Sequence, residues 1–128
     1  MEGASKMTEY MIKTPPIDIQ EALDRAMGEK EFLVMLLEEF SDGLTAQIEK
    51  MRVAIDQQDR ATLTQQSHTL KGAAGNLSAK AMAAVVMRLE QAGRSGDFET
   101  SSKLMAEMEM EATRLRQYLE KFDWSGLN

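Results

Sequence analysis

The sequence lacks cysteine entirely, and its 128 residues include only two prolines, one histidine and 5% aromatic residues. Without cysteine, disulfide bonds, cysteine-ligated zinc and thiol chemistry are excluded, and the protein fits a reducing compartment. No apolar run approaches the roughly 20 residues that span a membrane, and the N-terminus lacks a signal-like hydrophobic core. We therefore expect a cytoplasmic protein without membrane contact.

Positive charge is also scarce, because 15 lysines and arginines stand against 21 aspartates and glutamates, for a formal net charge of −6 at pH 7. A surface that binds nucleic acid has to neutralise phosphates, so this balance argues against nucleic acid as a partner. The expected partners are other proteins.

The abundant residues, chiefly Ala, Leu, Met, Glu, Gln, Lys and Arg, are strong helix formers. Apolar residues recur with helical spacing along one short and four long segments, and no segment reads as a strand. The helix expected at 79–93 ends at a turn expected over 93–96. The expected helices are a short one at 18–28, capped by Asp18 with Glu21 reaching back, and long ones at 30–57, from 59 to at least 74, at 79–93 and at 97–122.

Amphipathic helices joined by short loops predict an all-α fold, an antiparallel four-helix bundle with a short additional N-terminal helix. We assign this bundle to residues 15–128, a length typical of one compact domain. Residues 1–14 show no periodicity and are expected to form a flexible tail. Met7 is a candidate for the natural first residue, in which case residues 1–6 are an added segment.

The single histidine, His68, lies in the middle of the third expected helix, on the side opposite its predicted buried leucines. A lone histidine is more often an ordinary surface or core side chain than a functional one. Interior helical glycines cost about 1 kcal/mol each relative to alanine, so two glycines near His68 indicate a surface that has to stay bare. The residues that share the side of His68 are Ala61, Thr64, Gln65, Lys71, Gly72 and Gly75.

Plainer explanations exist for the neighbours of His68. Gly75 with Asn76 could be a helix C-cap, and Gly72 could let another helix approach. Lys71 is by default a solvated charge. Its position three residues after His68, beside a glycine, favours instead a cation that supports a phosphorylated imidazole, since three phosphoryl oxygens there need positive charge.

The run from His68 to Ala79, HTLKGAAGNLSA, resembles the signature of the histidine-containing phosphotransfer (HPt) family. In that signature the phosphoacceptor histidine is followed by apolar-Lys-Gly, two small residues and, after a short gap, an apolar-Gly-small ending. The order of expected helices extends the resemblance to about residues 17–122. One position departs from the signature, because Ser78 stands where the family often has glycine.

The resemblance implies a phosphoryl carrier of a multistep two-component phosphorelay, in which His68 takes the group from a receiver-domain aspartate or gives it to one. Lys71 is then expected to stabilise the phosphoryl charge. No cofactor or metal is expected on this chain, since the family takes Mg²⁺ and its acidic ligands from the receiver partner. Without a nucleotide-binding glycine loop no autokinase activity is expected either, and the protein is expected to be a monomer. The residues expected to contact the partner are Thr64, Gln65, Gly72 and Gly75.

Two other functions compete with this interpretation. A hydrolase would use Ser67 or Thr64 as nucleophile, but the sequence shows no evident acid to orient the single histidine. A helical docking adaptor would bind partner helices through methionine-rich faces, and replacing His68 would then be harmless. The methionines considered for that role are Met82, Met87, Met105, Met108 and Met110.

Overall fold

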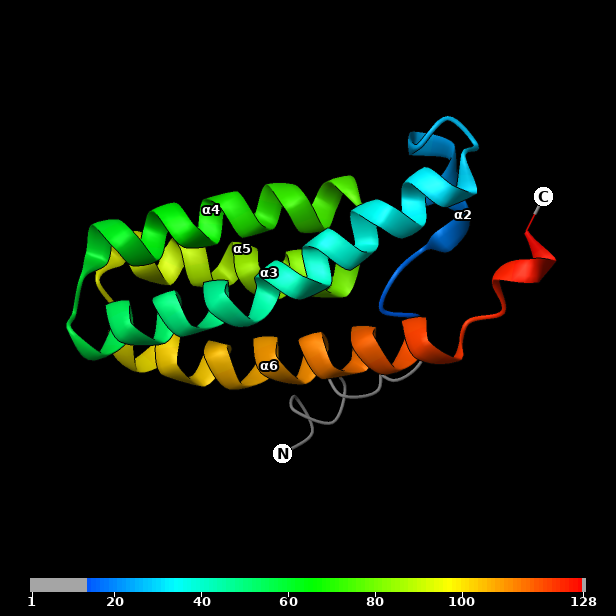
Figure 1. Ribbon diagram of the computed structural model, residues 1–128. Helices are drawn as coiled ribbons and strands as arrows, with labels where there is room; N and C mark the ends of the chain where they lie inside the picture. The colour runs from blue at the N-terminus through cyan, green and yellow to red at the C-terminus, as the bar shows by residue number, and fades with distance from the viewer. Residues whose placement is uncertain (1–13, 128) are drawn as a thin grey trace.

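The computed structural model describes residues 14–127, which form helices and short connections with no strand among them (Figure 1). The predicted all-α class is confirmed. The tail predicted at residues 1–14 lies outside the described residues except for Thr14. The elements are α2 (Ile19–Arg25), α3 (Lys30–Asp56), α4 (Arg60–Asn76), α5 (Lys80–Ser95), α6 (Phe98–Lys121) and a 3-10 turn, η1 (Trp124–Gly126).

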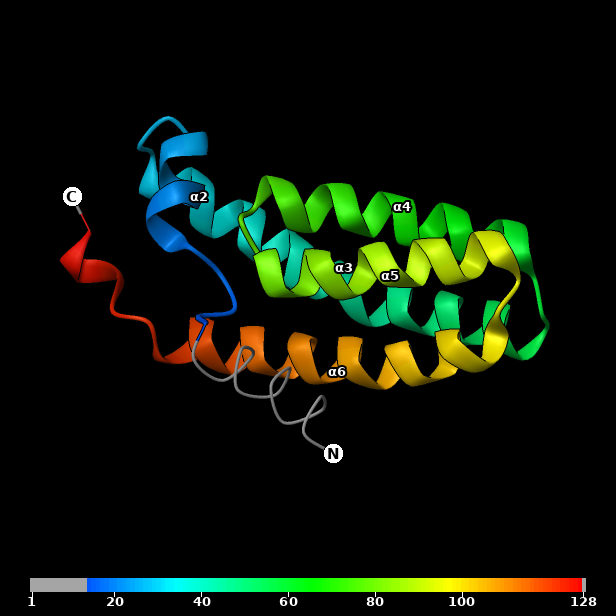
Figure 2. The same ribbon diagram turned by 180° about the vertical axis from the view of Figure 1, so that it is seen from behind.

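The four long helices run side by side in alternating directions, and the short α2 lies beside the first turns of α3 at one end of the bundle (Figures 1 and 2). Helix α4 packs between α3 and α5, and α6 completes the bundle against the same two helices. This is the antiparallel four-helix bundle with a short additional N-terminal helix that the periodicity predicts.

Aspartates begin three of the helices as N-caps, because their carboxylates accept hydrogen bonds from backbone N–H groups that have no partner within the helix. Asp18 accepts from the N–H of Glu21 at 3.1 Å, and Asp59 accepts from that of Thr62 at 3.1 Å. Asp97 caps α6 in the same way. The expectation that Glu21 reaches back to Asp18 is wrong, since the N–H of Asp18 donates to the Ser78 carbonyl and the Glu21 carboxylate binds Ser78, Lys80 and Arg25.

The core consists of the apolar side of each helix, as the pattern predicts. On α4 the buried side contains Leu63, Leu70 and Ala74, which leaves the opposite side free for polar residues. The methionines divide between the two environments. Met82, Met105 and Met108 are buried in the core, whereas Met87 and Met110 are exposed.

Helix α5 continues two residues into the turn predicted at 93–96 and ends at Ser95. Within 93–96, only Gly96 adopts the left-handed conformation, with φ of 71°, and it serves as the C-cap. Gly93 lies inside the helix, where an added Cβ would come within 3.0 Å of Thr64 Oγ1 and 3.2 Å of Leu63 Cγ. Its missing side chain therefore allows the end of α5 to lie close to the start of α4.

Ser78 lies in the turn between α4 and α5 with a left-handed φ of 59°, a conformation that favours glycine. This explains why the HPt signature often has glycine at this position. The buried Ser78 is held on both sides, because its hydroxyl donates to Glu21 Oε1 at 3.0 Å and its carbonyl accepts from the N–H of Asp18 at 3.0 Å. Lys80 Nζ binds Glu21 Oε2 at 2.8 Å. These contacts fasten α2 to the α4–α5 turn.

Candidate functional site

His68 lies near the middle of α4 on its solvent side, and 66% of its side-chain surface is exposed. The residues one position before it and two positions after it, Ser67 and Leu70, are fully buried. The α4 helix therefore holds the imidazole on a rigid surface, as the sequence predicts.

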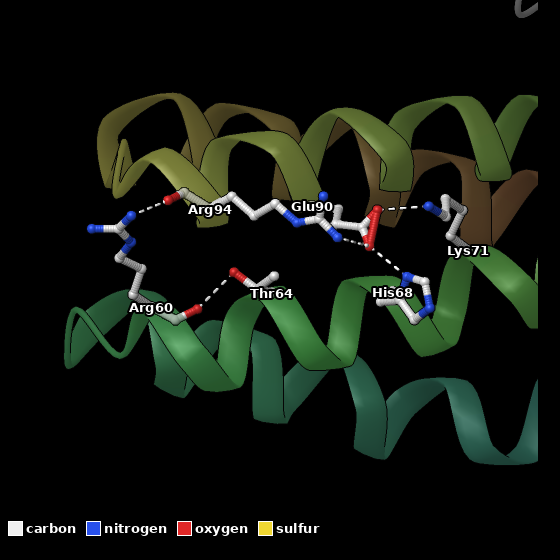
Figure 3. A network of polar contacts seen from close by, with 6 residues as sticks. All are labelled: Arg60, Thr64, His68, Lys71, Glu90 and Arg94. Atoms are coloured by element: carbon white, nitrogen blue, oxygen red, sulfur yellow. Dashed lines mark hydrogen bonds and ion pairs between the residues drawn. The ribbon is translucent and has the colours of Figure 1, made fainter.

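A buried carboxylate from the neighbouring helix holds the imidazole in place (Figure 3). Glu90 Oε2 lies 2.6 Å from His68 Nδ1, and Glu90 Oε1 lies 2.6 Å from Lys71 Nζ. Only 4% of the Glu90 side chain is exposed. An ionised carboxylate only accepts hydrogen bonds, so it selects the imidazole form with the proton on Nδ1 and leaves the lone pair on Nε2.

The cationic neighbours of Glu90 keep it charged in spite of its burial. The hydrogen bond from Lys71 is the largest influence that lowers the pKa of the Glu90 carboxyl; burial opposes it, while His68 and Arg94 add to it. A carboxylate with this lowered pKa is ionised at neutral pH. Glu90 therefore presents a fixed negative charge to Nδ1 of His68.

Two arginines lie at the other side of His68, toward the start of α4. Arg94 of α5 approaches Glu90 Oε2 at 3.5 Å, and the Arg60 guanidinium donates to the backbone carbonyl of Arg94 (Figure 3). The hydroxyl of Thr64 donates to the Arg60 carbonyl at 2.8 Å. A shallow cleft of about 600 Å³ opens here, lined by Arg60, Ala61, Thr64, Gln65, His68 and Arg94.

The two glycines beyond His68 leave an open surface. A Cβ built on Gly72 or Gly75 would meet nothing within 4 Å, so neither residue makes room for a neighbouring helix. Helix α4 continues through Gly75 to Asn76 and is capped by Leu77, which excludes Gly75 as a C-cap. The plainer explanations for both glycines are therefore wrong.

The structure brings most of the predicted site residues to one face of α4, where His68, Lys71 and Gly72 are neighbours and Thr64 and Gln65 line the adjoining cleft. Sequence reasoning missed Glu90, Arg94 and Arg60. The expectation that no acid lies near His68 is wrong, because Glu90 contacts it directly. A signal for Glu90 existed, since this charged residue occurs within the buried apolar stripe of α5 and buried carboxylates need partners.

The hydrolase alternative gains no support from Glu90. The Ser67 hydroxyl is fully buried on the other side of α4 and has no hydrogen-bond partner among the described residues. Thr64 directs its hydroxyl to a backbone carbonyl. Neither side chain forms the hydrogen bond to His68 that an activated nucleophile requires.

Over residues 14–127, no group of three or more histidine, aspartate or glutamate side chains gathers in a way that could hold a metal ion. None of the helices in this part of the chain has the length and apolarity needed to cross a membrane.

An exposed, oriented imidazole on an antiparallel helical bundle defines a class of protein that carries a group on histidine. Residues 35–118 match the family model of the Hpt domain. The chain therefore belongs to the Hpt domain family, and it is a histidine phosphotransfer protein of the kind that serves phosphorelays.

A solved structure has the same fold. The chain is similar to histidine-containing phosphotransfer protein B (HptB) from Pseudomonas aeruginosa PAO1, with a TM-score of 0.76 and 24% sequence identity over 85% of this chain and 95% of that chain. No curated protein matches the sequence. The family match lies inside the predicted domain of residues 15–128, whose boundaries stay a prediction.

Proposed function

We propose that His68 is the phosphoacceptor and that it exchanges its phosphoryl group with a receiver-domain aspartate. The observation that carries the proposal is the hydrogen bond between His68 Nδ1 and the buried Glu90. With the proton held on Nδ1, the lone pair of Nε2 attacks the phosphorus of an aspartyl phosphate, the P–O bond breaks and the aspartate carboxylate leaves. The reverse step returns the group to an aspartate.

The open face of α4 supports docking of a receiver beside His68. Gly72 lies one turn beyond the imidazole, and Gly75 follows on the same side. Beyond them a groove of about 560 Å³ separates α4 from α2 and α3, and we call it the α2–α4 groove. Its lining is mostly apolar and includes Ala22, Ala26, Leu33, Leu36, Phe40, Ala73 and Leu77.

This groove provides the apolar contact area that stable docking needs, while the glycines let the partner's aspartate approach Nε2. An adaptor without phosphotransfer chemistry would use the same groove. The two functions differ at His68, because only the phosphotransfer function requires that side chain.

The chemistry assigned to this chain is limited to the nucleophile and its electrostatic support. We propose that the divalent metal needed for in-line transfer is held by the receiver, and that this chain neither binds a cofactor nor phosphorylates itself from ATP. We also propose that it works as a monomer.

The deciding experiment is incubation of the protein with candidate receivers that have been phosphorylated beforehand. We expect acid-labile phosphate to appear on the chain and mass mapping to place it on His68. Phosphate found on any other residue, or no labelling by any phosphorylated receiver, would remove the basis of the proposal.

Replacing Lys71 with alanine is expected to slow transfer by about ten- to a hundredfold without abolishing it, because one charge-assisted contact is lost and the nucleophile stays in place. Lys71 contacts Glu90 at 2.6 Å in the unphosphorylated protein and is one-third exposed, so its ammonium can turn to the phosphoryl oxygens. Single-turnover transfer rates measure the effect. Equal rates for the variant and the parent across a range of salt would remove Lys71 from the mechanism.

Replacing Glu90 with leucine is expected to slow transfer by about ten- to a hundredfold, since the imidazole loses the acceptor that fixes its orientation and its Nδ1 proton. Glu90→Gln keeps a carbonyl oxygen for Nδ1 and should retain most of the activity. Nitrogen NMR of the ring gives a readout that is independent of transfer. We expect the proton on Nδ1 in the parent and on Nε2 in a substantial fraction of the leucine variant; an unchanged ring spectrum would contradict this role.

A further inference from the structure

Arg60 and Arg94, which we call the basic rim, lie on the same side of the bundle as His68 but toward the α3–α4 end (Figure 3). Both line the cleft that begins at His68. Arg94 has 64% of its side-chain surface exposed, and Arg60 is exposed as well. Two guanidinium groups therefore face a cleft that is open to a partner.

The basic rim is positive in a chain whose net charge is −6. No carboxylate lines the cleft. The nearest acidic residues in the sequence, Asp59 and Asp97, are engaged as N-caps of α4 and α6. Glu90 is buried, and its charge is offset by Lys71 and by Arg94 itself, whose guanidinium lies 3.5 Å from it, so Arg60 is the unpaired cation of the basic rim in the described part of the chain. Among the described residues, the Arg60 guanidinium binds only the neutral backbone carbonyl of Arg94, so its positive charge faces a cleft that no carboxylate lines and can attract an acidic group there.

The position of Arg60 separates it from the transferred group. Arg60 precedes His68 by eight residues on one helix, which corresponds to about 12 Å along the axis. A phosphoryl group on Nε2 extends only a few ångströms from the ring, and Lys71 lies one turn away on the other side of His68. Arg60 is therefore placed to meet a different anionic group, farther out on the docked partner.

A structural role explains part of the geometry of Arg60. Its guanidinium donates to the Arg94 carbonyl in the last turn of α5, and its side-chain carbons lie beside Gly96. That single contact leaves most of the five N–H donors of the guanidinium available, and a fork of donors suits a carboxylate. The contact also holds Arg60 at the cleft, which lowers the entropy lost when a partner binds.

We propose that the basic rim binds an acidic side chain of the receiver domain that lies outside its phosphorylation site, and that Arg60 thereby selects the partner and sets its orientation. This inference rests on the proposed function. The receiver would then make two kinds of contact, apolar contacts in the α2–α4 groove and a charged contact at the basic rim. Because the charged side is exposed, its contribution is to encounter and orientation, and it weakens as salt rises.

The test compares Arg60→Gln with Arg88→Gln as a matched control. Glutamine keeps a polar side chain with N–H donors, but it removes the positive charge of Arg60 from the basic rim. Arg88 is an exposed arginine on α5 that pairs with Glu107 of α6 at 3.4 Å, so its replacement changes the net charge equally on another face. Arg60→Lys keeps the charge and tests whether the charge is what matters.

Initial rates of transfer are measured against the concentration of a phosphorylated receiver that labels the parent, at about 50 mM and about 200 mM salt, where screening differs strongly. At low salt we expect Arg60→Gln to raise the apparent KM about three- to tenfold with kcat unchanged, and the difference to shrink at high salt. Arg88→Gln should leave KM within about twofold of the parent value. Arg60→Lys, which keeps the charge, should have a KM much closer to that of the parent than Arg60→Gln has.

Three results would overturn the proposal: equal KM changes in the Arg60→Gln and Arg88→Gln variants, a fall in kcat without a change in KM, or an effect that salt does not reduce. If no phosphorylated receiver labels the parent protein, that result contradicts the proposed function itself. The two failures are therefore distinguishable.

Discussion

Replacing His68 with glutamine is expected to abolish phosphoryl labelling while the helical bundle stays folded. Glutamine has no nitrogen lone pair able to attack phosphorus, yet its amide can donate to Glu90 Oε2 in place of Nδ1. His68 is largely exposed, so the free energy of unfolding should change by less than about 1 kcal/mol. Labelling by a phosphorylated receiver, together with thermal unfolding followed by circular dichroism, measures both effects.

The same variant separates phosphotransfer from adaptor function. If partner binding and pathway output persist unchanged in the glutamine variant, the protein acts as an adaptor and the imidazole is incidental. If labelling persists, another residue accepts the group. The expected combination is an intact fold, retained binding of the unphosphorylated receiver and no transfer.

Gly72→Leu is expected to give a more stable protein that no longer transfers phosphate. An added Cβ meets nothing within 4 Å, so leucine fits in the monomer and should stabilise α4 by roughly 0.5–1 kcal/mol through helix propensity. Its side chain projects from the surface one turn beyond His68, where the receiver has to bring its aspartate. We expect transfer to fall by at least about a hundredfold, since displacing reacting groups by an ångström is already costly.

Ala106→Leu is the matched control for an added apolar side chain. Ala106 is exposed on α6, which packs against α3 and α5, so its face is remote from His68. Transfer by this control should equal that of the parent. A Gly72→Leu variant that is destabilised by well over 1 kcal/mol would indicate packing at Gly72. A stable variant with normal transfer would show that the receiver docks from another side.

Periodicity and capping residues predict this fold well, because each helix buries one apolar side and begins at an Asp or near a turn. The error at Gly93 shows the limit of that reasoning. A glycine followed three residues later by Gly96 suggests a turn, but Gly93 is needed for close contact with Thr64 on another helix. Such a requirement comes from tertiary packing and has no local signal that distinguishes it from a turn.

The candidate site divides in the same way. Spacing within α4 places Lys71 and Gly72 beside His68, because positions three and four residues apart lie on one helical face. Glu90 and Arg94 come from α5. Whether they lie near His68 depends on which faces of α4 and α5 meet and on how the two helices are shifted along their axes. The sequence marks Glu90 as unusual within an apolar stripe, but it does not tell which side chains on α4 lie opposite.

The attachment of α2 has a consequence for how the protein responds to warming. With seven residues, α2 is too short to be stable alone, so its order depends on the contacts of Glu21 and on its few buried residues. Segments held in this way open locally at a lower free energy than the rest of a domain. Opening of α2 removes one wall of the α2–α4 groove but leaves Glu90 on His68. As the temperature rises, we therefore expect docking of the proposed receiver to weaken before His68 loses the surroundings proposed for phosphoryl transfer.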